Sequence, residues 1–158
     1  MTTCPCWSHP SPARPTVEVD ALFEAASPLA QRLAAEAPFK TGTQLVNRAY
    51  KLLDALSEPE KIATLNAHPR IGEDPRRLSA ASRSEQGDEP VPELEWLNAT
   101  YEEKFGFRFV VFVNGRPKRD LVKILKQRLN NGREQELATG LKAVVDIARA
   151  RLEKARPA

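Results

Sequence analysis

Apolar residues recur at steps of three and four along most of the chain after residue 16, which is the spacing of one face of an α-helix. One such stripe runs from Leu137 to Leu152, and a clearer one lies between residues 45 and 56. Both patterns predict amphipathic helices. The clearer stripe consists of Leu45, Val46, Ala49, Leu52, Leu53 and Leu56.

Several residue pairs mark the expected ends of these helices. Ser27-Pro28 predicts an N-cap followed by proline at the first helical position, and Ser57 with Glu60 predicts a capping box. Periodicity resumes near residue 92, and Gly106 is expected to terminate that helix. The sequence therefore predicts a series of short helices with defined boundaries.

One segment favours a different conformation. The run Phe107–Val113 has strand propensity, and Asn114-Gly115 is typical of a turn. A lone strand cannot form a sheet, because its backbone groups need partners. We therefore expect an all-α fold, a single-domain bundle of about seven to nine helices in which residues 107–115 are extended or distorted.

Length and composition fit this fold. The chain has 158 residues, and a domain of this size buries roughly two-thirds of the surface that its unfolded chain exposes. Residues 1–16 are proline-rich and are expected to form a disordered leader, with the domain at 17–158. The longest apolar run, 109–113, is far shorter than the ~20 residues of a membrane span, and no secretory signal is recognisable.

Charge and cysteine content exclude several classes of partner. Lys and Arg number 24 against 21 Asp and Glu, and the signs are interspersed, which predicts a solvated surface rather than a nucleic-acid site. The same balance is compatible with a basic pocket for an anionic substrate. Cys4 and Cys6 are half a zinc site at most, so no metal is expected. Without a disulfide framework, the cytoplasm is the expected compartment.

Candidate chemistry lies between residues 67 and 92, a segment that is long for a connection in a helical domain and is therefore expected to be a functional loop. It contains His68, the only histidine outside the leader, followed by Pro69. Glu85 follows seventeen residues after His68. Enzymes often use an imidazole together with a carboxylate for acid–base catalysis near neutral pH. The alternatives are that His68 caps a helix end or lies on the surface, and that Glu85 is merely solvated.

Short motifs along residues ~20 to 153 resemble, in order, those of the 2-oxo-4-hydroxy-4-carboxy-5-ureidoimidazoline (OHCU) decarboxylase family. Glu73-Asp74-Pro75 and residues 87–90 depart from the expected loop composition. The matching motifs are FEAASP at 23–28, APF at 37–39, HP at 68–69, SxxEQ at 82–86, LNATY at 97–101, KFGF at 104–107, VNGR at 113–116 and IARARL at 147–152.

The resemblance implies a cofactor-free enzyme, a homodimer, that converts the ureidoimidazoline to (S)-allantoin and CO2 during urate breakdown. It implies that His68 and Glu85 are catalytic. It places Arg151 on the substrate, with Arg149 as the rival in the same motif. The remaining implied substrate contacts are Pro69, Ser82, Arg83, Ser84, Gln86, Phe109, Val110, Val111, Phe112 and Val113.

Two alternatives remain open on the sequence. The first is a protein of the same fold that acts on a related ureido or imidazoline compound. The second is a small helical binding module without catalytic activity, whose binding would not depend on His68.

Overall fold

The computed structural model describes residues 18–72, 80 and 91–155. Within these ranges the chain forms helices and no β-strand, which confirms the all-α prediction. The helices are α1 (Val19–Leu22), α2 (Pro28–Glu36), α3 (Gly42–Leu53), α4 (Glu58–Asn66), α6 (Pro92–Phe105), α7 (Lys118–Arg128) and α8 (Arg133–Ala155).

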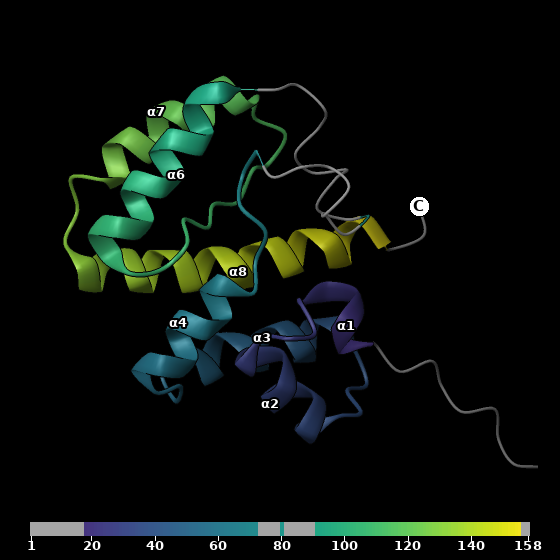
Figure 1. Ribbon diagram of the computed structural model, residues 1–158. Helices are drawn as coiled ribbons and strands as arrows, with labels where there is room; N and C mark the ends of the chain where they lie inside the picture. Colours follow the sequence, from purple (N-terminus) through teal and green to yellow (C-terminus); the bar gives the residue numbers. More distant parts are fainter. Residues whose placement is uncertain (1–17, 73–79, 81–90, 156–158) are drawn as a thin grey trace, which may run out of the picture.

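The long helix α8 organises the molecule. Figure 1 shows α1 to α4 on one side of α8, and α6 with α7 on the other. Helices α1, α3 and α4 pack directly on α8, and α6 packs on α7. The apolar stripe at 45–56 faces this core, because Leu45 and Ala49 are fully buried.

The helix boundaries follow the predicted signals. The Ser27 hydroxyl accepts a hydrogen bond from the N–H of Ala30 at 3.1 Å, and Pro28 is the first residue of α2. Ser57 and Glu60 form the capping box of α4. Gly106 ends α6 in the left-handed conformation, with φ of 84°. These local predictions are therefore confirmed.

A small residue allows α4 to approach α8 closely. A Cβ atom placed on Gly140 of α8 would lie 3.0 Å from Cδ2 of Leu65, so a larger residue would require the Leu65 side chain to shift. Leu65 is fully buried near the end of α4. This contact places the residues that follow α4 beside the middle of α8.

Residues 107–113 cross the core as an extended segment without strand pairing. Arg128 fastens them: its Nη1 donates to the carbonyl of Val110 at 2.7 Å, and its Nε donates to Glu136 at 2.7 Å. Tyr101 donates to the same carboxylate at 2.7 Å. A buried polar network thus binds the segment through the Val110 carbonyl, and the prediction of an extended segment in a helical bundle is confirmed.

Among the residues that the structure describes, no helix is long and apolar enough to cross a membrane.

Candidate active site

His68 lies directly after α4, where the chain leaves the helix. Its N–H donates to the carbonyl of Leu65 at 3.1 Å, and its carbonyl accepts a hydrogen bond from Nη1 of Arg108 at 2.9 Å. Pro69 prevents the helix from continuing, since it disfavours the helical conformation in the residue before it. The side chain of His68 is only 5% exposed, so it is neither a surface residue nor a solvated cap.

Burial keeps the imidazole of His68 neutral. It lowers the pKa of His68 from 6.5 to about 3, and the positive charge of Arg151 adds to the lowering. Both effects disfavour a second proton on the ring. A neutral imidazole at physiological pH can accept a proton from a substrate.

The two candidate arginines of α8 lie in different surroundings. Arg151 is buried, its Nη1 donates to the carbonyl of Leu22 at 3.1 Å, and its charge acts on the imidazole of His68. The side chain of Arg149 is 56% exposed and pairs with Asp146 at 3.8 Å. The positive charge of Arg151, and not that of Arg149, therefore acts on the imidazole of His68.

The segment 109–113 differs from the helices in the hydrogen bonding of its backbone N–H groups. Its valines and Phe109 are buried, and Phe112 is half-buried, so these side chains belong to the core. No backbone N–H of residues 109–113 donates a hydrogen bond to another residue of the described ranges. These main-chain donors are suited to bind the polar edge of a ligand.

Arg108 connects the segment 109–113 to the end of α4 and to His68. Its backbone N–H donates to Oδ1 of Asn66 at 3.0 Å, while its side chain reaches the His68 carbonyl. No role for Arg108 was apparent from the sequence. Its side chain also lies 3.7 Å from Glu102, a contact that the spacing of the two residues does not reveal.

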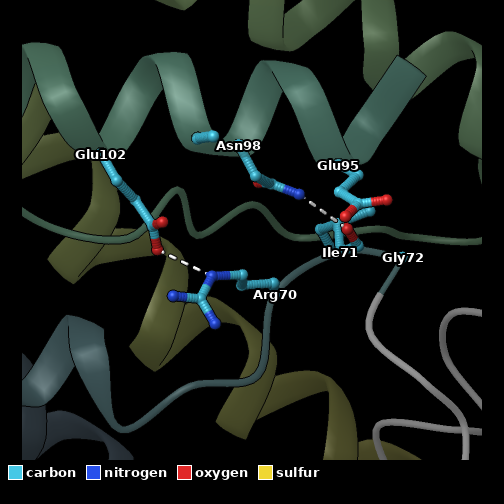
Figure 2. A pocket seen from close by; sticks show the side chains of 7 residues that line it. Arg70, Ile71, Gly72, Glu95, Asn98 and Glu102 are labelled. Carbon is cyan, nitrogen blue, oxygen red and sulfur yellow. Dashed lines mark hydrogen bonds and ion pairs between the residues drawn. The ribbon is translucent and has the colours of Figure 1, made fainter. Parts of the chain in front are cut away.

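The turn after His68 is clamped to α6, around a pocket of about 480 Å³ (Figure 2). Nε of Arg70 donates to Oε1 of Glu102 at 2.9 Å, and Nδ2 of Asn98 donates to the carbonyl of Ile71 at 2.8 Å. These bonds fix residues 70–72 and therefore the exit of the chain from His68.

The other predicted site residues lie outside the described residues. This applies to Glu85 and to four of the predicted substrate contacts, and their roles stay predictions. The four are Ser82, Arg83, Ser84 and Gln86. No group of three or more His, Cys, Asp or Glu side chains within the described ranges is arranged to hold a metal ion.

Comparison with known proteins connects this geometry to a family. The model of the OHCU decarboxylase family matches residues 10–153. The 2-oxo-4-hydroxy-4-carboxy-5-ureidoimidazoline decarboxylase of Xenopus laevis is 31% identical over 126 residues, covering 73% of this chain and 72% of that protein. The uric acid degradation bifunctional protein of Bacillus sp. (strain TB-90) is 28% identical over 141 residues, covering 84% of this chain.

The chain spans only 28% of the length of that bifunctional protein. The fold also matches a crystal structure of OHCU decarboxylase in the presence of (S)-allantoin, with a TM-score of 0.63 and 24% identity. That match covers 82% of this chain and 91% of the other. Because the family model covers nearly the whole chain, this protein belongs to the OHCU decarboxylase family.

Proposed function

We propose that this protein decarboxylates 2-oxo-4-hydroxy-4-carboxy-5-ureidoimidazoline to (S)-allantoin and CO2, without a cofactor. The observation that carries the proposal is a buried, neutral His68 under the charge of the buried Arg151, in a chain of the OHCU decarboxylase family. This reaction requires an acid–base group and a cation that binds the anionic substrate.

The substrate supplies its own electron sink. Its carboxylate and hydroxyl share one ring carbon, next to a C=N carbon that bears the ureido group. Loss of CO2 breaks the bond to the carboxylate and leaves an electron pair, which spreads into the C=N bond. The protein then needs only to orient the substrate and move protons.

Three protons move, and we propose that His68 carries two of them. One leaves the hydroxyl oxygen as it becomes a carbonyl, and a neutral imidazole is ready to accept it. A second must reach one face of the neighbouring carbon to give the (S) product, and a third, taken up from solvent, reaches the nitrogen that received the electron pair. A protonated His68 is disfavoured by burial and by Arg151, so it returns a proton readily. The negative charge of a bound substrate raises the pKa of His68 towards the working pH.

The groups around His68 orient the substrate. Arg151 binds an anionic or carbonyl oxygen through its planar fork. The backbone N–H groups of residues 109–113 bind polar edges of the ring. Glu85 orients His68 and accepts substrate N–H groups, and Ser82 and Gln86 bind the ring or the ureido group. Pro69, Arg83 and Ser84 are further proposed substrate contacts.

The test is a circular-dichroism time course at the allantoin band, starting from urate with its oxidase and hydrolase present. Wild-type protein should produce the (S)-allantoin signal well ahead of a control without it. His68→Ala should lower the rate by about 10²- to 10⁴-fold, because an acid–base group is lost. A wild-type trace that follows the enzyme-free control would exclude the proposed reaction.

We also propose that the protein is a cytoplasmic homodimer. Trp96 on α6 is 66% exposed, and large aromatic residues are enriched at protein interfaces. Light scattering on the purified protein tests the assembly: a mass near twice the 17.6 kDa of one chain supports it, and a single-chain mass contradicts it. Cell fractionation tests the compartment.

A further inference from the structure

Arg108 connects the two sides of the molecule at the site. His68 follows α4, which lies on one side of α8, whereas the segment 109–113 follows α6, on the other side (Figure 1). The acid–base group and the backbone N–H groups of the segment 109–113 therefore come from different halves of the fold. Their relative position determines whether one substrate molecule can meet both.

Arg108 makes two hydrogen bonds to the end of α4, one from its backbone and one from its side chain. Its backbone N–H donates to Oδ1 of Asn66 at 3.0 Å, and its Nη1 donates to the carbonyl of His68 at 2.9 Å. A single hydrogen bond fixes a distance but leaves rotation about it free. Two bonds from one residue to positions two apart in the chain restrict distance and rotation together. Arg108 therefore fixes His68 relative to the segment 109–113, which begins at the next residue.

A carboxylate on α6 attracts the side chain of Arg108. Oε1 of Glu102 lies 3.7 Å from Nε of Arg108, and both side chains are partly buried. The same oxygen accepts a hydrogen bond from Nε of Arg70 at 2.9 Å (Figure 2). Partly buried charges are screened less by salt than exposed ones. Glu102 thus steadies Arg108 and, through Arg70, also binds the chain two residues after His68.

A purely structural explanation is that Arg108 caps the end of α4. The last carbonyl groups of a helix lack helical partners, and a cation stabilises that end. A cap of this kind affects stability alone and requires only the guanidinium. The backbone N–H of Arg108 is nevertheless bound to Asn66 as well, directly before the segment 109–113. This second bond is the one that a positioning role requires.

Arg133 provides a comparison, because it makes the same kinds of contact away from the site. Its Nε donates to the carbonyl of Phe105 at 3.1 Å, and its Nη1 donates to the carboxylate of Glu58 at 2.8 Å. Like Arg108, it contacts one carbonyl and one carboxylate and connects α4 with α6. Glu58 is the first residue of α4, at the opposite end of the helix from His68. Arg133 is therefore a matched control.

We propose that Arg108 is a positioning residue, which holds the imidazole of His68 at a fixed place relative to the substrate-binding backbone of the segment 109–113. The inference rests on the proposed function for the identity of the substrate and for the roles of His68 and this segment. Arg108 acts through the backbone of His68. A misplacement of about 1 Å can lower a rate about a hundredfold, so a loosened His68 slows the chemical step.

The kinetic experiment compares Arg108→Gln, Arg108→Lys and the control Arg133→Gln in the allantoin assay. Arg108→Gln should lower kcat by about ten- to a hundredfold and change KM by less than about threefold, because the base is displaced while the substrate-binding groups remain. Arg108→Lys keeps a donor for the His68 carbonyl and should recover part of the loss. Arg133→Gln should match wild type in both constants.

Two results of this comparison would overturn the inference. A higher KM with unchanged kcat in Arg108→Gln would show that Arg108 binds the substrate directly. Equal losses in Arg108→Gln and Arg133→Gln would show that either arginine contributes to the structure alone.

The backbone bond is tested at Asn66, since a side-chain substitution cannot remove the N–H of Arg108. Asn66→Ala removes the acceptor, whereas Asn66→Asp keeps an oxygen in its place. Asn66→Ala should lower kcat by about three- to tenfold, and Asn66→Asp should recover most of the loss. A kcat of Asn66→Ala equal to that of wild type would contradict the role of this bond in positioning His68.

Imidazole NMR tests the inference without any substrate. The chain has two histidines, His9 and His68, so the ring signals of His68 are identified by their loss in His68→Gln. Wild type and Arg133→Gln should give one narrow set of His68 signals, and Arg108→Gln should give broadened or multiple signals. Identical His68 signals in wild type and Arg108→Gln would overturn the inference whatever the activity. The expected change in a protein whose wild type shows no turnover would support the positioning of the ring and exclude the decarboxylase proposal alone.

Discussion

Two arginines are buried within the described ranges of this protein, and their surroundings differ. Arg128 uses hydrogen bonds of 2.7 Å to the carboxylate of Glu136 and to the carbonyl of Val110, and it stacks 4.6 Å above the ring of Phe109. Arg151 donates to the carbonyl of Leu22, while its carboxylate neighbour Glu24 stays 3.7 Å away. Arg128 is held in the core by these bonds, whereas the charge of Arg151 acts on the imidazole of His68.

The difference shows how one residue type serves structure and chemistry in a single fold. A tightly paired buried arginine stabilises its surroundings only while its partner remains, since an unpaired charge is costly. A buried arginine whose charge acts on a neutral histidine is suited to bind an anionic ligand. We therefore expect changes at Arg128 to affect folding, and changes at Arg151 to affect turnover.

The largest expected effect is on folding, at Glu136. Glu136→Gln keeps the shape of the side chain but leaves the charge of Arg128 buried without a counter-charge. The free energy of unfolding should fall by about 3–5 kcal/mol, measured by urea denaturation. The double variant with Arg128→Met and Glu136→Leu should recover most of the loss. If Glu136→Gln were as stable as wild type, the structural role of the Arg128–Glu136 pair would be contradicted.

The next effect is on turnover, at Arg151. Arg151→Gln removes one anchoring cation and should lower kcat/KM by about 10²- to 10³-fold in the allantoin assay, the range for losing one preorganised charge-stabilising donor. Its unfolding midpoint should change less than that of Glu136→Gln. Arg149→Gln is the matched control from the exposed face of α8 and should keep wild-type activity. Equal losses for the two variants would contradict the assignment of Arg151.

The smallest expected effect is on the pH dependence of stability, through His68. The pKa of His68 is about 3 in the folded protein, against its ordinary value of 6.5, so the unfolded chain binds more protons below pH 6.5. The contribution of neutral His68 to the free energy of unfolding is therefore complete above pH 6.5. It is lost as pH falls towards 3, by up to about 1.4 kcal/mol per pH unit. Urea denaturation from about pH 7 to about pH 4.5 should show a shallower loss for His68→Gln than for wild type. Parallel curves would mean that His68 is not buried as a neutral ring.

Local signals in the sequence determined the helices. Ser27, Pro28, Ser57 and Gly106 act on their own or adjacent backbone groups, so their effects are readable without the rest of the fold. The same holds for the exposed or buried pattern of 45–56. His68-Pro69 marked the end of a helix and the start of the functional loop, again from neighbouring residues.

Only the tertiary structure decided which residues meet at the site. Arg149 and Arg151 share one motif, yet two residues turn a helix by about 200°, so the side chain of Arg149 is exposed and Arg151 is buried. Leu22 and Arg151 are 129 residues apart in the chain, and no periodicity links them or Glu24. Residues 107–113 have strand propensity, but in the fold Arg128 binds the Val110 carbonyl and most of their side chains pack in the core. Local propensity set the elements; packing and charge between distant residues set the chemistry.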